Sequence, residues 1–434
     1  MKILFLSDNF PPETNAPATR TMEHCKEWVK KGAEVTVITC APNFPKGKVY
    51  EGYKNKRSEE MIDGIRVIRV KTFIAANAGF ARRILDYMSF AFMSFFAGLP
   101  IKTDIIVATS PQFFTTFSGC ALSFFKRKPW IFELRDLWPE SIITVGAMKK
   151  GLAYKILEKI ELFLYRRAAK VIPVTQSFKR NLIGRGIDPN KIEVITNGSN
   201  IELFQPMEKD EKLLKELGLE DKIVVGYIGT HGMAHGLDFI LNCFSKIMNP
   251  KIHLLMIGDG AKKQSLVEQA KSLGLKNVTF LNPVQKENIP EYISITDITL
   301  APLRRSDTFK TVIPSKIFEA AAMKKPILLG VEGESKEIVE RYNAGAAYIP
   351  EDRGGRGVPL GLLVRSRRLR GGRPRPHPPL LGRVRESQRE VLRPPDGKPD
   401  RLEHRRDPER GVGEEGLSGK TDRRGGRTPL ERDL

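Results

Sequence analysis

Short apolar runs alternate with helix-length segments through the first 350 residues of the chain. The runs are continuous rather than strictly alternating, which is typical of strands that are covered on both faces of a parallel sheet. Strands that alternate with helices in this way predict an α/β fold with crossover helices. In the first half, the expected strands are KILFLSD, EVTVIT, IRVIRV, DIIVATS, PWIFELRD, KVIPVT and KIEVITN.

A second series of strands follows the charged, proline-containing stretch NIELFQPMEKDEKLLKELGLED. Its expected members are IVVGYIG, IHLLMIGDG, VTFLNPV, ITLAPL, PILLGV and AAYIP. One hydrophobic core usually stops growing near roughly 250–300 residues, so a chain of 434 residues has room for two. We therefore predict two doubly wound parallel-sheet domains, residues 1–203 and 204–352, with ligands bound where the strands end.

The last part of the chain, residues 353–434, differs sharply in composition from the rest. It contains no Ala, Ile, Phe, Tyr, Trp, Met, Asn or Cys, and its bases are 20 Arg and 2 Lys. A segment this poor in apolar area cannot offset chain entropy, so we expect this Arg/Gly/Pro-rich tail to be disordered. Because the absent residue types are mainly those with A/T-rich codons, we also hypothesise that the tail is a gene read in a shifted frame. The second domain would then be incomplete.

The formal charge of +21 divides almost evenly between two unequal stretches. Residues 1–352 hold 50 Lys and Arg against 39 Asp and Glu, whereas the tail holds 22 against 12. A basic tail can bind nucleic acid or anionic lipid. Since most of the chain is only mildly basic, we predict no nucleic-acid partner, and keep binding through the tail as an alternative.

Nothing near the amino terminus predicts export. The opening MKILFLSDNFPPE has a short apolar run that ends at an acid and two prolines, too brief for a secretory signal. The four cysteines, Cys25, Cys40, Cys120 and Cys243, form no pair at metal-ligand spacing, which fits a reducing compartment. We expect a cytoplasmic protein.

The most apolar stretch of the first domain is ARRILDYMSFAFMSFFAGLP, residues 81–100. Asp86 and the closing Gly-Leu-Pro leave it short of the roughly 20 clean apolar residues of a spanning helix. Two interpretations stay open: a core crossover helix, or an interfacial helix whose aromatic face enters the lipid headgroups. The next helix, QFFTTFSGCALSFFKRKP, also has aromatic residues followed by bases, which favours a surface that meets membrane. The membrane candidates are Arg82, Arg83, Tyr87 and Phe90.

The second domain carries strand–glycine–helix patterns suited to phosphate. GYIGTHGMAHGLDFIL and IHLLMIGDG each end a strand in a glycine turn, whose free N–H groups and helix dipole can bind an anion, although such turns are common in α/β proteins. TVIPSKIFEAAAMKKPILLG places Ser315 and Lys316 at the first turn of a helix, with Glu319 one turn on. The hydroxyl and ammonium can hold a diphosphate, and the carboxylate can grip two ribose hydroxyls.

On these motifs the chain resembles retaining glycosyltransferase family 4, and within it the fucosamine-type transferases of O-antigen and capsule assembly. The resemblance covers roughly residues 1–350 and rests on PPETNAPATRTMEHCKEWVKKGAEVTVIT, FELRDLWPES, VITNGSNIELFQP, GTHGMAHGLD and PSKIFEAAAMKKPI, in that order. It implies a GT-B fold, with two Rossmann-like domains facing a cleft. It also implies transfer of a sugar from a nucleotide-sugar donor, such as a UDP-linked N-acetyl-6-deoxyhexose, to a polyprenyl-linked saccharide at the inner face of the cell membrane. A non-hydrolysing nucleotide-sugar 2-epimerase shares this architecture and is the alternative enzyme.

The resemblance also implies residue roles in the second domain. Glu319 matches the family's ribose-binding glutamate, whereas Thr311 stands where another family glutamate would be. Thr230 and His235 stand where relatives commonly have Arg and Lys, which makes Lys316, with Arg304 or Arg305, the candidates for the phosphates. The predicted donor-binding residues are Gly229, Thr230, His231, Gly232, His235, Gly258, Gly260, Arg304, Ser315, Lys316 and Glu319.

In the first domain, ELRDLWPES offers several charges directly after a buried strand, which capping of a loop and helix start explains equally well. The resemblance places this loop at the cleft, where many relatives carry a His-Asp pair against the donor sugar. Asp136 matches the Asp, and Arg135 stands where the His would. We predict Asp136, Glu133 and Arg135 as catalytic and Pro12, Glu13 and Asn15 on the acceptor side. No Asp-x-Asp motif supports an obligatory metal, so we predict no cofactor.

Overall fold

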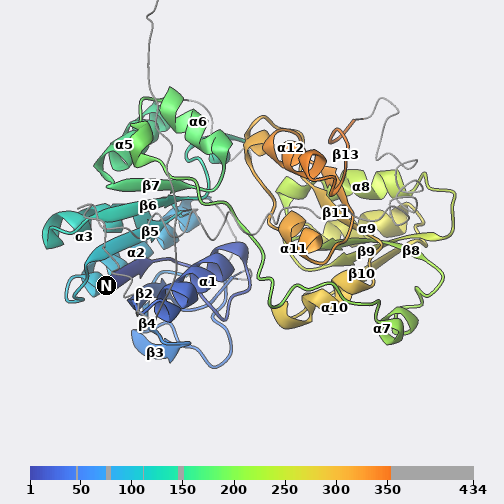
Figure 1. Cartoon of the computed structure of the whole chain (residues 1–434), viewed down its shortest axis with the longest axis horizontal. Helices are drawn as coiled ribbons and strands as arrows, with labels where there is room; N and C mark the ends of the chain where they lie inside the picture. The colour runs from blue at the N-terminus through green and yellow to red at the C-terminus, as the bar shows by residue number, and fades with distance from the viewer. Residues whose placement is uncertain (45–46, 75–79, 111, 145–150, 353–434) are drawn as a thin grey trace, which may run out of the picture. The chain divides into compact units, whose positions relative to one another are not determined.

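The computed structural model describes residues 1–44, 47–74, 80–110, 112–144 and 151–352. The tail at residues 353–434, with its predicted disorder and shifted reading frame, lies outside the described residues. The described chain forms two sheets flanked by helices, β1–β7 and then β8–β13 (Figure 1). The predicted pair of doubly wound α/β domains is therefore confirmed.

The first sheet has the strand order β3-β4-β2-β1-β5-β6-β7. Its neighbours are parallel except for β3, which pairs antiparallel with β4 at the edge. The strands are β1 (Lys2–Leu6), β2 (Glu34–Cys40), β3 (Ser58–Ile62), β4 (Ile65–Val70), β5 (Ile105–Thr109), β6 (Trp130–Leu134) and β7 (Lys170–Pro173). Its helices are α1 (Ala16–Lys30), α2 (Phe80–Gly98), α3 (Thr115–Lys126), α4 (Glu140–Thr144), α5 (Leu152–Arg167), α6 (Gln176–Gly184) and the short 3-10 helix η1 (Pro189–Lys191).

Two details of this domain differ from the sequence prediction. The edge strand β3 was missed because its residues, SEEMI, are mostly exposed and polar rather than a continuous apolar run. The predicted strand KIEVITN was wrong, since its only β-contact is an isolated bridge from Ile192 to Val171. The carbonyls of Ile195 and Thr196 instead accept hydrogen bonds from the side chain of Arg20, which removes them from any ladder.

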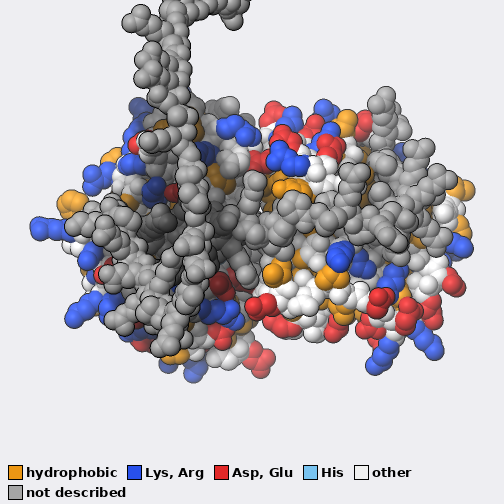
Figure 2. Space-filling view, in the orientation of Figure 1, with side chains coloured by type: hydrophobic (Ala, Val, Ile, Leu, Met, Phe, Trp, Pro, Cys, Tyr) orange, Lys and Arg blue, Asp and Glu red, His pale blue; other side chains and the backbone are white. Residues whose placement is uncertain are grey.

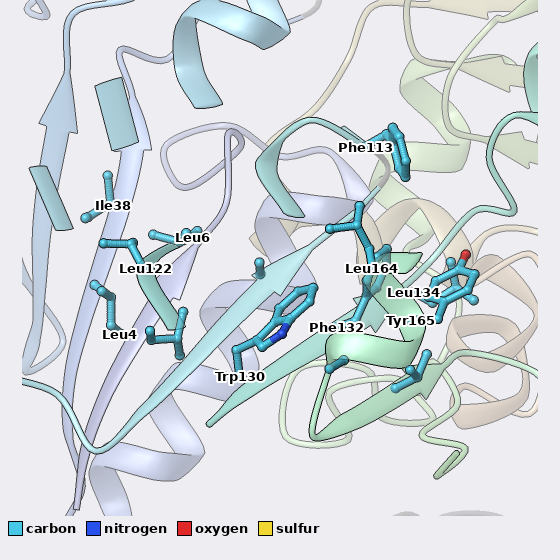
Figure 3. Packing of buried hydrophobic residues seen from close by; sticks show 14 of the residues in the cluster. Leu4, Leu6, Ile38, Phe113, Leu122, Trp130, Phe132, Leu134, Leu164 and Tyr165 are labelled. Atoms are coloured by element: carbon cyan, nitrogen blue, oxygen red, sulfur yellow. The ribbon is translucent and has the colours of Figure 1, made fainter. Parts of the chain in front are cut away.

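The first sheet separates two apolar layers. Leu4 and Leu6 of β1 face one layer together with residues of α2, α3 and α5, and Figure 3 shows Leu122 and Leu164 on that side with Trp130 and Phe132. Ile3 and Phe5, the alternate residues of β1, face the other layer, where α1 packs. The period-2 alternation of β1 therefore fills both layers, as expected of a strand in the middle of a parallel sheet.

The second sheet is parallel throughout, in the order β10-β9-β8-β11-β12-β13. Its strands are β8 (Ile223–Ile228), β9 (Ile252–Ile257), β10 (Val278–Leu281), β11 (Ile298–Pro302), β12 (Ile327–Gly330) and β13 (Gly345–Ala347), which are the six that were predicted. Its α-helices are α7 (Glu211–Glu216), α8 (Leu237–Phe244), α9 (Lys263–Ser272), α10 (Ile289–Ser294), α11 (Lys316–Ala322) and α12 (Glu334–Arg341). The 3-10 helices are η2 (Met233–His235), η3 (Lys286–Asn288) and η4 (Thr308–Thr311).

Strand order shows where ligands should bind in each domain. The order reverses between the neighbouring strands β1 and β5 in the first sheet, and between β8 and β11 in the second. In open α/β sheets, ligands bind outside the carboxyl ends of the strands at such reversal points. The loops after β1, β5, β8 and β11 are therefore the first places to look for a site.

Candidate active site

Two glycine turns touch at the carboxyl ends of β8 and β9. Gly229, Gly258 and Gly260 have φ of +145°, +141° and +153°, a conformation that L side chains rarely adopt. A Cβ atom on Gly258 would lie 2.0 Å from the carbonyl oxygen of Gly229, and one on Gly260 would lie 2.6 Å from that of His231. Glycine is therefore required at these positions for the two loops to approach each other, and the structure brings the predicted glycines together.

Lys316 reaches this loop from the start of α11. Its Nζ lies 3.9 Å from the ring centroid of Tyr227, and a Cβ atom on Gly229 would lie only 3.1 Å from the same nitrogen. Within the described residues, no ion pair joins this ammonium to a carboxylate. Burial lowers the pKa of Lys316 to about 8, although the field of Glu319 opposes that shift. An anion bound beside Gly229 would therefore find a cation that is not yet neutralised.

Two histidines of the same loop have ring nitrogens without partners in the described structure. His231 is fully buried and neither of its ring nitrogens is paired, and Nδ1 of His235 is also unpaired. Burial lowers the pKa of His231 to about 4 and that of His235 to about 3, and the positive charge of Lys316 contributes to both shifts. Both rings are neutral at pH 7, so each has one N–H donor and one acceptor nitrogen, and of the two only His235 is partly exposed.

Four other predicted donor residues lie around this loop. The carbonyl of Thr230 accepts a hydrogen bond from the hydroxyl of Tyr227 at 2.6 Å, and Gly232 directly precedes η2. Ser315 directly precedes α11, and its hydroxyl makes no capping hydrogen bond. Glu319 lies one turn further along α11, where burial raises its pKa. Ser315, Lys316 and Glu319 thus follow one another along the start of α11.

Arg304, another predicted phosphate ligand, already has partners. Its guanidinium donates to Asp238 at 3.1 Å and lies 4.0 Å from a carboxylate oxygen of Glu351. Its backbone N–H donates to the carbonyl of Ala234 and fastens the glycine-rich loop to the end of β11. Of the two predicted phosphate-binding cations, Lys316 is therefore the one without a carboxylate partner among the described residues.

In the first domain, Glu133 lies at the end of β6 in a buried ion pair. Its Oε1 accepts from Nε of Arg20 at 2.9 Å, and Nδ1 of His24 lies 3.6 Å away. Burial alone would raise the pKa of Glu133, but Arg20, His24, Arg135 and a hydrogen bond with Thr109 together outweigh it and the pKa is about 2. Arg20 also donates to the carbonyls of Ile195 and Thr196 and to the side chain of Asn197, so it ties Glu133 to the segment after β7.

Oε1 of Glu133 is occupied by Arg20, whereas its Oε2 is buried and has no hydrogen-bond partner in the described structure. Direct contact between Glu133 and a sugar stays a prediction. Sequence reasoning missed Arg20 and His24. The signal was available, since the two residues stand four apart on α1 and so share one helical face, here the one turned to the sheet.

Asp136 and Arg135 follow β6 in a loop that Ser110 holds. The Ser110 hydroxyl accepts from the backbone N–H of Arg135 at 2.8 Å and from that of Asp136 at 3.4 Å. Burial raises the pKa of Asp136 and lowers that of Arg135 to about 10. The two predicted catalytic residues therefore lie side by side at the carboxyl end of the sheet, fixed through their backbone by the end of β5.

The predicted acceptor-side residues build the loop between β1 and α1. Oε1 of the buried Glu13 accepts from the backbone N–H groups of Asn43 at 2.7 Å and Phe44 at 2.9 Å. Asn15 caps α1 by accepting from Ala18 N–H at 2.9 Å. Pro12 is exposed beside them. Glu13 and Asn15 thus shape the loop through these contacts, and binding of an acceptor by this loop stays a prediction.

Asp8, directly after β1, is a candidate that sequence reasoning missed. Its Oδ1 is buried and has no hydrogen-bond partner in the described structure. Burial raises the pKa of this carboxyl group to about 7, with further contributions from Asp86 and Glu13. The sequence signal was the position of Asp8. It is the first charged residue after the central strand β1, where the strand order of the sheet reverses.

The predicted membrane residues of α2 separate into two groups. Arg82 and Arg83 are exposed and Tyr87 is partly buried. Phe90 is fully buried in the core between α2 and the sheet, so its assignment to a membrane surface was wrong. The reason is helical phase, since Phe90 lies on the face of α2 that turns inward. No helix in the described part of the chain is long and apolar enough to cross a bilayer.

Comparison with known proteins identifies both domains. Residues 15–198 match the model of the glycosyl transferase 4-like domain, and residues 209–353 match that of the glycosyl transferases group 1. The glycosyl transferase WcaI of Escherichia coli, named for colanic acid biosynthesis, is 24% identical over 332 residues, which cover 74% of this chain and 81% of that protein. TuaH of Bacillus subtilis, named for teichuronic acid biosynthesis, is 26% identical over 219 residues, 49% of this chain and 53% of that protein.

Solved structures agree on the fold. Anabaena HepE in complex with UDP-glucose superposes with a TM-score of 0.63 at 20% identity, over 85% of this chain and 91% of that one. A Listeria monocytogenes structure named as a UDP-N-acetylglucosamine 2-epimerase gives a TM-score of 0.52 at 13% identity, over 86% and 88%. Fold alone therefore does not separate transferase from epimerase, but the two sequence-family matches do. The chain belongs to glycosyltransferase family 4, with the GT-B fold.

Proposed function

We propose that this protein transfers a sugar, with retention of configuration, from a nucleotide-sugar donor to a lipid-linked saccharide in cell-surface polysaccharide assembly. The donor that we propose is a UDP-linked N-acetyl-6-deoxyhexose such as UDP-N-acetylfucosamine, and the acceptor carrier is a polyprenyl lipid at the inner face of the cell membrane. Support comes from the names of WcaI and TuaH, which refer to colanic and teichuronic acid, and from HepE, which was solved with UDP-glucose.

The observation that carries this proposal is the unneutralised Lys316 ammonium beside Gly229. The main barrier to transfer is departure of the nucleotide diphosphate, which leaves negative charge on phosphate oxygens. Fixed cations and N–H dipoles aimed at those oxygens stabilise the transition state more than they stabilise bound substrate. Lys316 supplies the charge, and the neutral rings of His231 and His235 supply N–H groups that need no reorganisation.

In the proposed reaction, the bond from the anomeric carbon to the phosphate oxygen breaks while the acceptor hydroxyl approaches the same face of the sugar. The departing phosphate oxygen takes the acceptor proton, so no covalent enzyme nucleophile is needed. Asp136 orients sugar hydroxyls and eases the positive charge that develops on the ring. Glu133 contributes indirectly, by holding Arg20 and the loop that Arg20 binds. Glu319 binds the ribose hydroxyls.

We also propose that transfer needs no metal. Within the described residues, no group of three or more His, Cys, Asp or Glu side chains could hold a metal ion. Lys316 takes the place that a divalent cation has in other phosphate sites. Activity should therefore survive EDTA, and loss in EDTA that magnesium restores would contradict this part of the proposal.

The test is a panel of nucleotide-sugars incubated with the purified protein and a membrane extract. Labelled product should appear in the lipid fraction with the UDP-linked N-acetyl-6-deoxyhexose and not with UDP-glucose or a GDP-sugar. Without extract, the donor should be recovered unchanged. Recovery of an epimer from the donor alone would identify an epimerase and overturn the proposal, as would absence of lipid-linked product with every donor.

A further inference from the structure

The helices α2, α3 and α5 form one layer on one face of the first sheet. Phe90 and Ala97 of α2, Leu122 of α3 and Leu164 of α5 all belong to a single core cluster with the strands. In this layer α2 packs against α3 and α3 packs against α5. The side of each helix opposite this core must therefore point away from the sheet, and the three outer sides together make one outer surface of the domain (Figure 1).

This outer surface carries large apolar side chains that nothing in the described structure covers. Along α2 they recur every three or four residues, and the end of α3 adds two neighbouring phenylalanines. We call these six residues the aromatic patch: Leu85, Met88, Phe92, Phe96, Phe124 and Phe125. The side chains of Phe92, Phe124 and Phe125 are each more than 60% exposed. An apolar surface of this kind on a folded domain indicates an interaction site.

Ring contacts make the aromatic patch continuous from one helix to the next. The ring centroids of Phe92 and Phe96 are 4.7 Å apart, and those of Phe124 and Phe125 are 5.6 Å apart. Phe95, which is partly buried, joins the two pairs, since its ring lies 5.2 Å from Phe96 and 5.5 Å from Phe125. The third helix of the layer, α5, exposes Leu152, Ile156 and Phe163 as well.

The charges around the aromatic patch are of one sign. On α2, on α5 and in the turn after α3, every exposed charged side chain is basic: Arg82, Arg83, Arg127, Lys128, Lys155, Lys159, Arg166 and Arg167. The acids of these helices are partly or wholly covered, and Glu161 is bound by Arg185 and by the hydroxyl of Tyr165. Figure 2 shows Lys and Arg side chains along the outer edge of this domain with hydrophobic side chains between them.

We propose that the aromatic patch, with its surrounding bases, docks this domain on an anionic lipid bilayer. Phe92, Phe124 and Phe125 enter the boundary between headgroups and acyl chains, while the bases meet lipid phosphates. Aromatic residues with flanking Lys and Arg are the combination that interfacial helices use. A second copy of the chain fits less well, because two such surfaces would bring like charges together. The inference shares with the proposed function its lipid-linked acceptor and its place at the membrane, but it does not depend on the transfer reaction.

The test places a fluorophore in the aromatic patch and asks whether it enters acyl chains. The full chain with Phe124→Trp is mixed with phosphatidylglycerol–phosphatidylethanolamine vesicles whose acyl chains carry bromine, and its emission is measured relative to the parent protein. Bromine should quench the added fluorescence. Met248→Trp is the matched control, since Met248 is also exposed but lies on the second domain, and it should not be quenched. No quenching at position 124, or equal quenching at both positions, would overturn the proposal.

A second measurement separates the aromatic patch from the basic tail, which can itself attract anionic lipid. In vesicle sedimentation, Phe92→Ser with Phe125→Ser should lower the partition coefficient at least tenfold, whereas Met61→Ser with Met248→Ser should leave it unchanged. Arg127→Gln and Lys128→Gln should each lower it roughly fivefold. If Phe92→Ser with Phe125→Ser instead abolishes self-association without lipid, a second copy covers the patch and the proposal is overturned. No sugar is present, so failure here is distinct from failure of the transfer reaction.

Discussion

The two domains share one architecture but differ in how the main charged group near their strand ends is paired. In the first domain, Glu133 pairs with Arg20, and Glu13 holds two backbone N–H groups. In the second domain, Lys316 lies beside the glycine-rich loop without an ion pair to a described carboxylate, and both ring nitrogens of His231 in that loop are unpaired in the described structure. Burying an unpartnered polar group costs stability, so such groups are expected where a ligand will supply the missing contacts. Both domains bury unpaired polar atoms, among them Asp8 Oδ1 and Glu133 Oε2 in the first and the ring of His231 in the second. The contrast lies in the main charges: Glu133 is paired with Arg20, whereas no described carboxylate forms an ion pair with Lys316.

The largest effect should be on folding stability, from breaking the ion pair between Arg20 and Glu133 in the first domain. Arg20→Ala would leave Glu133 charged, buried and unpaired, which typically costs about 3–5 kcal/mol of folding free energy. Urea unfolding of the variant and the parent measures this loss. Lys30→Ala removes an exposed pair with Glu27 and serves as the control, where little change is expected. An Arg20→Ala protein as stable as the parent would show that the network does not stabilise the domain.

The next largest effect should be on the transfer rate, through Lys316 of the second domain. Lys316→Ala should lower the transfer rate by about 10² or more, because the ammonium meets charge that develops mainly in the transition state. Its folding stability should stay near that of the parent, the reverse of the result for Arg20→Ala. The control is Lys336→Ala on α12, whose side chain pairs with Glu340 on the surface. An unchanged rate would remove Lys316 from the donor site.

The smallest expected effect is a pH dependence of UDP affinity, which tests the ionisation of Lys316 in the second domain. The pKa of Lys316 without ligand is about 8, and a bound diphosphate should raise it. Affinity for UDP should therefore be complete well below pH 8 and be lost as the pH rises through 8, by about tenfold between pH 7 and pH 9. Calorimetric titration with UDP measures this. The dependence should disappear in Lys316→Ala, and an equal pH dependence in both proteins would assign the titration to another group.

The predictions of the fold held wherever the sequence pattern was strong. Buried parallel strands read as continuous apolar runs, and all six strands of the second sheet were found in this way. The antiparallel edge strand at Ser58–Ile62 was missed because an exposed strand has no such run. The segment KIEVITN has the composition of a strand. Two of its carbonyls instead accept hydrogen bonds from the side chain of Arg20, more than 170 residues away in the chain. A contact that distant has no local signature.

For the candidate site, sequence located the loops but not the state of each group in them. The Gly-rich turns and Ser315, Lys316 and Glu319 could be named from strand–turn–helix patterns and from family motifs. That Arg304 is paired with Asp238 while Lys316 has no carboxylate partner in the described structure could not be. Phe90 failed as a membrane residue for a related reason: composition shows that α2 is aromatic, but only the phase of the helix against the sheet decides which rings are exposed.

The sequence by itself determined the two-domain α/β architecture, the places of the glycine turns and the family, because apolar periodicity and backbone freedom are properties of neighbouring residues. Tertiary structure alone decided which charges are satisfied, which aromatic rings are covered, and how the pKa values of Asp8 and Lys316 shift. Those quantities depend on burial and on partners brought together from distant parts of the chain. Electrostatic and packing energies depend on the distances between groups in space, and the order of residues along the chain does not specify those distances.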